Sequence, residues 1–238
     1  MLDFRRFRVL TFDCYGTLID WERGIVEALR PVIERHGVSR SGDELLELFG
    51  ELESPMQRGG FRRYREVLTL VMDGVAERLG LTLGDGERAA LAESVGNWPP
   101  FPDTVDALAR LAKHYRLAIV SNVDDDLFAG SARQLAVAFA DVVTAEQVGS
   151  YKPDRRNFEV ALERVGRMGA SSDQVLHVAQ SVFHDIKPAR QMGLATVWVN
   201  RRHDRQGHGA TPLADATPDL EVPDLGTLAR LVDEALSA

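Results

Sequence analysis

The stretch VLTFDCYGT, residues 9 to 17, decides the fold that the sequence predicts. Its first four residues are apolar or β-branched, and the carboxylate of Asp13 follows them directly. Short runs of this kind, bounded by polar and turn residues, are typical of strands buried in a parallel sheet. In open α/β sheets, ligands bind outside the carboxyl ends of the strands. The stretch therefore predicts a buried first strand that places Asp13 at a functional site.

Four later runs have the same character, and helix-periodic segments separate them. The runs are residues 117–120, 142–145, 175–179 and 195–200, and the helical patterns lie at 103–115, 157–166 and 185–193. Strands that alternate with helices indicate an α/β core with a parallel sheet. A last helical pattern, residues 225–236, should end the chain.

Residues 20–96 break this alternation, because their patterns are helical and no good strand lies among them. The segment 97–103 that follows holds three prolines in seven residues, which is typical of a linker. We therefore predict a core formed by residues 1–19 and 97–238, with residues 20–96 inserted as a helical subdomain.

The composition excludes several classes of protein. The chain has 238 residues, a formal net charge of −8 and one cysteine, Cys14. The negative charge argues against nucleic acid and anionic membranes as partners, and one cysteine cannot form a disulfide framework. No run approaches the roughly 18 apolar residues of a membrane span, and the first residues lack the pattern of a secretory signal. A cytoplasmic protein is expected, and the sequence leaves a homodimer open.

Polar residues also follow the other predicted strands, namely Ser121 with Asn122, then Lys152, and finally a segment that ends in Asp185. Because the carboxyl ends of parallel strands meet at one edge of the sheet, these side chains should converge on Asp13. A lysine beside an aspartate favours the ionised carboxylate, which can act as a nucleophile. A second carboxylate can activate water to break the resulting intermediate.

Four short motifs occur in order along the chain: FDCYGT at 12–17, VSN at 120–122, YKPD at 151–154 and AQSVFHDI at 179–186. Together they resemble the haloacid dehalogenase superfamily, in which a helical cap follows the first motif. The resemblance covers nearly the whole chain and implies a Rossmann-like α/β fold with an α-helical cap at residues 20–96. It also implies that Asp13 is the nucleophile, that Lys152 steadies its charge and that Asp185 serves the hydrolytic step.

The same resemblance implies a substrate-binding set for a small anionic molecule. Its members are Tyr15, Thr17, Ser121, Asn122, Gln180 and Ser181. In the superfamily's phosphatases, the position of Tyr15 usually carries an aspartate that protonates the alcohol leaving group. A tyrosine there resembles the L-2-haloacid dehalogenases, and halide needs no proton in order to leave.

The phosphatases of this superfamily also bind Mg²⁺ through the nucleophile and the acids of the fourth motif. A hard cation of this kind prefers several oxygen ligands. Here Gln180 replaces the leading acid of the fourth motif, and Tyr15 replaces another acid. We therefore expect no metal and no other cofactor, and Mg²⁺ would be required only if the protein were a phosphatase.

The dehalogenase pattern is incomplete in the predicted cap. The arginine that helps to receive halide in the well-studied dehalogenases aligns with Gly50. Four arginines follow soon after, and they either supply this cation or form a solvated basic face: Arg58, Arg62, Arg63 and Arg65. We place Arg62 and Arg65 in the substrate-binding set. Phe158 and Val182 also stand where the family pattern has a tyrosine and an asparagine.

The sequence thus predicts a hydrolase that removes halide from a small 2-haloalkanoic acid through an aspartyl ester. One alternative is a phosphatase that acts on a small phosphorylated metabolite. The other alternative is a catalytically silent binding protein on the same scaffold. The chain length and the stereochemistry of the substrate stay open.

Overall fold

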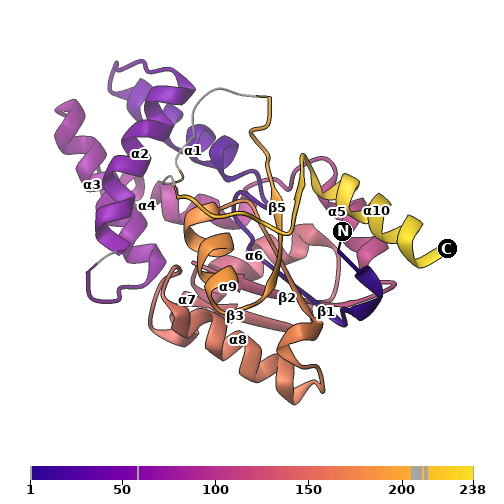
Figure 1. Cartoon of the computed structure of the whole chain (residues 1–238). Helices are drawn as coiled ribbons and strands as arrows, with labels where there is room; N and C mark the ends of the chain where they lie inside the picture. Colours follow the sequence, from indigo (N-terminus) through magenta and orange to yellow (C-terminus); the bar gives the residue numbers. More distant parts are fainter. Residues whose placement is uncertain (1, 58, 205–210, 212–213, 238) are drawn as a thin grey trace.

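The core of the protein is a six-stranded parallel sheet with β1 (Val9–Phe12) near its middle (Figure 1). The computed structural model describes residues 2–57, 59–204, 211 and 214–237. The strand order is β3-β2-β1-β4-β5-β6, and every pair of neighbours is parallel. This arrangement confirms the predicted α/β, Rossmann-like fold.

The other elements occupy the segments between the strands. The remaining strands are β2 (Arg116–Ser121), β3 (Asp141–Thr144), β4 (Val175–Ala179), β5 (Ala195–Val199) and β6 (Leu220–Val222). The α-helices are α1 (Trp21–Arg35), α2 (Gly42–Gln57), α3 (Tyr64–Leu79), α4 (Asp85–Ser94), α5 (Thr104–Leu111), α6 (Asp125–Leu135), α7 (Ala145–Val148), α8 (Arg155–Arg167), α9 (Lys187–Gln191) and α10 (Leu225–Ser237). Single turns are η1 (Phe4–Arg6), η2 (Val95–Asn97), η3 (Ser172–Gln174) and η4 (Val182–Ile186).

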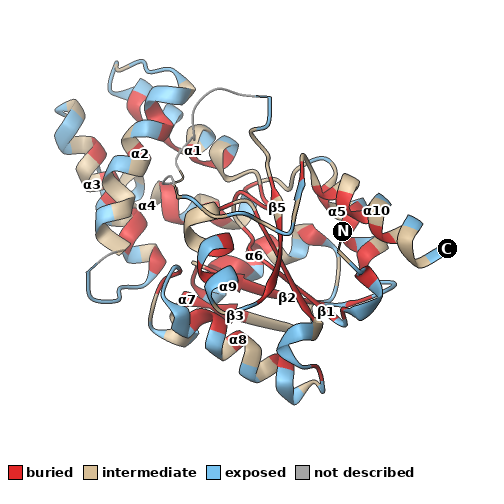
Figure 2. Cartoon of the chain, viewed as in Figure 1, coloured by how far each residue is buried: buried red, intermediate tan, exposed pale blue. Residues whose placement is uncertain are grey.

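Both faces of the sheet are covered by helices, as the burial of the strands shows in Figure 2. Successive side chains of a strand point to opposite faces. In β1, Leu10 and Phe12 join the cluster that contains the apolar residues of α5 and α10, whereas Val9 packs in the cluster that contains Phe158 of α8 and Ala189 of α9. A strand that is buried on both faces is mainly apolar, which explains the run before Asp13. Its one hydroxyl, Thr11 Oγ1, lies 2.9 Å from His177 Nδ1.

Helices α1 to α4 follow β1 and pack on one another beside the sheet (Figure 1). Each helix has an apolar side in the common core, with Leu29 of α1, Phe49 of α2, Val71 of α3 and Leu91 of α4 all fully buried. Between Asp20 and Asn97, the residues that the structure describes form no strand. This helical insertion agrees with the predicted fold class.

The predicted strands lie within one residue of the observed ones, with one omission. No strand is predicted between the run 195–200 and the last helical pattern at 225–236, so β6 is missing from the prediction. This strand has three residues and pairs only with β5, so its sequence carries little periodic signal. Among the described residues, no helix is long and apolar enough to cross a bilayer.

Candidate active site

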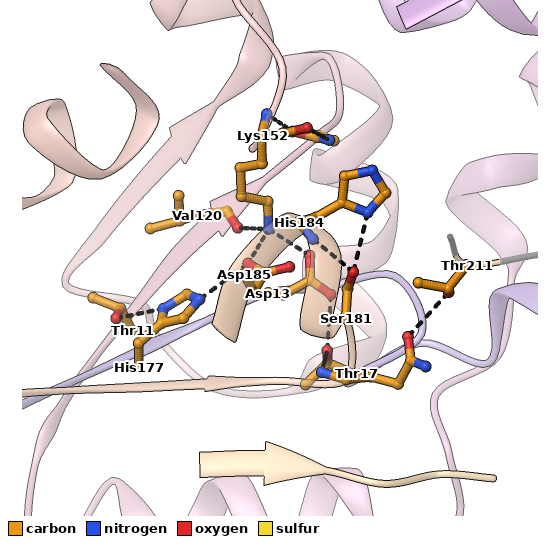
Figure 3. Close-up of polar contacts among 12 residues, drawn as sticks. Thr11, Asp13, Thr17, Val120, Lys152, His177, Ser181, His184, Asp185 and Thr211 are labelled. Carbon is orange, nitrogen blue, oxygen red and sulfur yellow. Dashed lines mark hydrogen bonds and ion pairs between the residues drawn. The ribbon is translucent and has the colours of Figure 1, made fainter. Parts of the chain in front are cut away.

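Three charged side chains meet at the carboxyl edge of the sheet, as Figure 3 shows. Asp13 directly follows β1, Lys152 lies in the loop between α7 and α8, and Asp185 belongs to the turn η4 after β4. The Lys152 ammonium donates to Asp13 Oδ1 at 2.8 Å and to Asp185 Oδ1 at 2.7 Å. It also donates to the backbone oxygen of Val120 at 2.7 Å. Lys152 therefore joins the two carboxylates with all three of its hydrogens engaged.

The turn after Asp13 brings Thr17 back to the carboxylate. Gly16 has a φ of +92°, which a residue with a side chain rarely adopts. Thr17 Oγ1 then donates to Asp13 Oδ2 at 2.8 Å and accepts a hydrogen bond from the backbone nitrogen of Gln180 at 2.9 Å. Because the hydroxyl has one hydrogen, and Asp13 receives it, Thr17 orients Asp13 in this structure rather than facing a substrate.

His177 is a second partner of Asp185 that the sequence analysis did not place in the site. Its Nε2 lies 3.0 Å from Asp185 Oδ1, and its Nδ1 lies 2.9 Å from Thr11 Oγ1 (Figure 3). The side chain is fully buried beneath the sheet edge. A signal was present, because a histidine inside the apolar strand VLHVA needs a hydrogen-bond partner once it is buried.

Burial and charge act on the three groups in different directions. Burial raises the pKa of Asp13 against the opposing effect of Lys152, and the nearby Asp185 raises it further. Burial also acts on Asp185, but Lys152 and His177 outweigh it and hold the pKa of this carboxyl below its usual value. Burial alone would lower the pKa of Lys152, but the two carboxylates raise it, so Lys152 stays protonated.

Two buried polar atoms of the site have no hydrogen-bond partner within the described part of the chain. They are Ser121 Oγ, at the end of β2, and Asp185 Oδ2. Both residues line a pocket above Asp13. Buried polar atoms are normally paired, so these two are the groups best suited to meet a substrate and a water molecule.

The side chains of Asn122, Gln180 and Ser181 form hydrogen bonds with other residues of the protein. The Asn122 amide donates to the backbone oxygen of Lys152 at 3.0 Å and accepts from its backbone nitrogen at 2.7 Å, so it fixes the lysine loop. The amide oxygen of Gln180 accepts from Thr211 at 3.3 Å. Ser181 Oγ accepts the backbone N–H of His184 at 2.9 Å and pairs with its ring nitrogen. Asn122, Gln180 and Ser181 nevertheless all line the pocket.

Tyr15 contributes an aromatic wall to the pocket and does not supply a proton donor for a leaving group. Its hydroxyl shares a hydrogen bond with Ser131 Oγ at 3.0 Å, and its ring meets the Trp98 ring edge to face at 5.8 Å. Burial raises the pKa of the phenol well above its usual value, so the ring stays neutral. Its place in the pocket lining makes the region above Asp13 drier.

The two arginines expected in the substrate-binding set lie elsewhere. Arg65 binds Asp126 at 2.6 Å, and Arg62 is exposed and uses its backbone oxygen to accept the Tyr151 hydroxyl at 2.8 Å. Arg63 pairs with Glu146 at 2.7 Å, and Arg58 lies outside the described residues. None of the described arginines lines the pocket, and the inserted helices contribute Trp21, Glu53, Gln57 and Tyr64 instead.

The donor set suits a hard divalent cation poorly. The described residues bring together no group of three or more histidine, cysteine, aspartate or glutamate side chains able to hold a metal ion. The Lys152 ammonium binds one oxygen of Asp13 and one of Asp185, and its positive charge opposes a cation in the same place. Mg²⁺ prefers several oxygen ligands, which this arrangement does not offer.

Comparisons with known proteins show the family of this chain. A family model described as haloacid dehalogenase-like hydrolase matches residues 7–193. The chain belongs to this hydrolase family. It is 27% identical to an (S)-2-haloacid dehalogenase of Pseudomonas putida, over 95% of this chain and 97% of that protein. It is 30% identical to a glyceraldehyde 3-phosphate phosphatase of Methanothermobacter thermautotrophicus, over 81% of this chain and 85% of that protein.

A solved structure of an L-2-haloacid dehalogenase has the same fold as this haloacid dehalogenase-like hydrolase. The two superpose with a TM-score of 0.80 at 24% identity, covering 96% of this chain and 99% of the other. The superposition thus extends over the helical insertion as well as the sheet.

Proposed function

We propose that this hydrolase removes halide from a small 2-haloalkanoic acid, with Asp13 as the nucleophile. The observation that carries the proposal is the setting of Asp13, which is held by Lys152 and Thr17 below a pocket with an aromatic wall. The (S)-2-haloacid dehalogenase of Pseudomonas putida, which aligns with nearly the whole chain, supports the same reaction.

The first step is displacement at the α-carbon of the substrate. An Asp13 oxygen forms a bond to this carbon, and the carbon–halogen bond breaks with its electron pair leaving on the halide. The free Ser121 hydroxyl is placed to donate to the substrate carboxylate. Lys152 stays protonated and stabilises the carboxylate before the attack.

The second step is hydrolysis of the aspartyl ester. Asp185 Oδ1 is occupied by Lys152 and His177, whereas Oδ2 is free to take a proton from water. The resulting hydroxide attacks the carbonyl carbon of Asp13, and the tetrahedral intermediate expels the product alkoxide. Asp185 returns the proton to this alkoxide, so that a 2-hydroxy acid leaves. Asp13 is left as a carboxylic acid, and it loses its proton to solvent to regenerate the carboxylate. No step uses a metal ion, and we propose that the reaction needs no cofactor.

A panel of short 2-haloalkanoic acids tests this proposal. Purified protein should release halide in proportion to substrate consumed, and the Asp13→Asn variant should release at least about a thousandfold less at the same folded concentration. Near-equal rates for wild type and Asp13→Asn would refute the nucleophile, and no halide release from any acid of the panel would refute the substrate class.

A phosphatase is the second candidate, because the phosphatase of Methanothermobacter thermautotrophicus aligns with most of the chain. A phosphate ester requires an acid for its alcohol leaving group, and Tyr15 cannot supply one. A panel of small phosphate monoesters assayed with Mg²⁺ separates the two functions. Phosphate release that depends on Mg²⁺ and exceeds halide release would favour the phosphatase.

A further inference from the structure

A carboxyl group from the inserted helices lies in the pocket above Asp13. Glu53, on the last two turns of α2, lines the pocket together with Gln57 of the same helix and Tyr64 of α3. The two residues of α2 are four positions apart, so they share one face of the helix. The steps proposed above give Glu53 no task.

The partners of Glu53 are neutral. The Gln57 amide donates to Glu53 Oε1, and the Tyr64 hydroxyl shares a hydrogen bond with the carboxyl group. Among the described residues, which leave out Arg58, neither an arginine nor a lysine forms a salt bridge with Glu53. Burial raises the pKa of Glu53 to about 7, while the hydrogen bond from Tyr64 opposes the rise. A group of this kind changes its charge near neutral pH.

The other charges of the pocket favour the protonated form once an anionic substrate enters. Asp13 and Asp185 share the single charge of Lys152, which leaves the cluster with one net negative charge. A substrate carboxylate adds another, and the attack moves the negative charge of Asp13 onto the departing halide in the pocket. An ionised Glu53 beside them would add repulsion without a described cation to offset it.

We infer that Glu53 acts as a protonated hydrogen-bond donor to the departing halide, taking the part of an anion receiver in this pocket. Gln57 donates to Oε1, so we place the proton of Glu53 on Oε2, within the pocket that would hold the leaving group. As the bond from Asp13 to the α-carbon forms and the carbon–halogen bond breaks, the halide keeps the electron pair and accepts the Glu53 hydrogen bond. A donor that is in place before the charge develops stabilises the transition state more than the substrate. This inference rests on the proposed dehalogenation.

The inference predicts that activity declines with rising pH. The other titratable groups that face Glu53 or its pocket are Asp13, Tyr15, Tyr64, Tyr151, Lys152, His184 and Asp185. Burial raises the pKa of all three tyrosines above its usual value and lowers the pKa of His184 to about 4. The two aspartates must be ionised to work, so they make activity rise with pH. A decline that begins near pH 7 is therefore the signature of Glu53.

The experiment compares pH profiles of halide release for wild type and for Glu53→Gln. Wild-type kcat/KM should fall about tenfold per pH unit above its Glu53 pKa. Glu53→Gln keeps a donor at every pH, so its profile should stay flat to pH 9 and exceed wild type there. Glu51→Gln is the matched control, since Glu51 is exposed on the same helix and pairs with Arg78 at 3.1 Å.

Each other outcome is decisive. Halide release by wild type without a decline between pH 7 and 9, or a decline that persists in Glu53→Gln, overturns the inference and leaves the dehalogenation standing. Wild-type activity that rises through this range and is lost in Glu53→Gln also overturns it, because ionised Glu53 would then accept a hydrogen bond from the substrate. Absence of halide release at every pH refutes the proposed function itself. The wild-type profile decides the first point even if a variant fails to fold.

Discussion

Lys152 Nζ lies 2.8 Å from Asp13 Oδ1, although the two residues are 139 positions apart in the sequence. The ammonium is almost completely enclosed, with 2% of its side chain exposed, and a second carboxylate lies against its other side. Folding therefore removes one cation and two anions from water together, which is favourable only while all three are present.

Replacing Lys152 by methionine should abolish activity and destabilise the protein. Two buried carboxylates would lose their common cation, and breaking a buried ion pair costs about 3–5 kcal/mol. Urea unfolding at pH 7 measures the loss. Lys187→Met is the control, because Lys187 is exposed at the start of α9. A loss below about 1 kcal/mol would mean that Lys152 does not stabilise the carboxylates.

Replacing Asp185 by asparagine should separate the two steps of the proposed reaction. The attack by Asp13 does not need Asp185 to accept a proton, but ester hydrolysis does. Rapid mixing should show a burst of about one halide per active site, followed by a rate at least about a hundredfold below wild type. Intact-protein mass spectrometry should detect the ester. Asp43→Asn, at an exposed position, is the control and should behave as wild type. A slow reaction of Asp185→Asn without a burst would assign Asp185 to the first step.

His177→Leu should move the low-pH limit of ester hydrolysis to higher pH. Lys152 and His177 hold the pKa of Asp185 below its usual value against the effect of burial. Without the hydrogen bond from His177 the pKa rises, so a higher pH is needed to ionise Asp185 and let it accept a proton. Single-turnover rates from pH 4 to 8 measure the shift, with His36→Gln as an exposed control. An unchanged limit would leave His177 with a packing role only.

Glu53→Gln should stabilise the protein at high pH and not at low pH. The pKa of Glu53 rises from 4.5 to about 7 on folding. A carboxyl group whose pKa is raised on folding does not lower the free energy of unfolding at a pH below its unfolded pKa. The free energy of unfolding then falls as the pH rises from the unfolded pKa through the folded pKa. A rise of about 2.5 units corresponds to at most about 3 kcal/mol, and to less here because Glu53 is partly exposed to the pocket. Thermal unfolding of both proteins at pH 4 and pH 8 checks this, and an equal difference at the two pH values would contradict it.

Chelation should leave halide release unchanged. The ammonium of Lys152 already binds both carboxylates of the site, so a cation has no favourable place there. Activity measured after dialysis against EDTA, with and without added Mg²⁺, should agree within about twofold, a difference of less than about 0.5 kcal/mol in the barrier. Restoration of a lost activity by Mg²⁺ would contradict the proposed mechanism.

The fold followed from the sequence because its strands are buried on both faces. Such strands are mainly apolar, and the polar residue at the carboxyl end of a strand marks the edge of the sheet, as Asp13 and Ser121 do. β6 was not predicted because an edge strand of three residues is too short to show an alternating hydrophobic pattern.

The rest of the site depends on contacts that local sequence does not contain. Arg62 and Arg65 lie close to the pocket residues in sequence, yet Arg65 turns to Asp126 on α6 and Arg62 to solvent. In the sequence, Glu53 is one acid among several on an amphipathic helix. Its place in the pocket and its raised pKa result from the packing of α2, α3 and the core around it. His177 likewise became informative only once Asp185 was placed beside it.

Isotope labelling of Asp13 tests the central claim most directly. In a single turnover with excess enzyme in ¹⁸O-labelled water, water attacks the carbonyl carbon of the aspartyl ester. One labelled oxygen should therefore remain in the peptide that contains Asp13, and the first hydroxy-acid product should carry none. A labelled product together with an unlabelled Asp13 would show that water attacks the substrate directly, which would contradict Asp13 as the nucleophile.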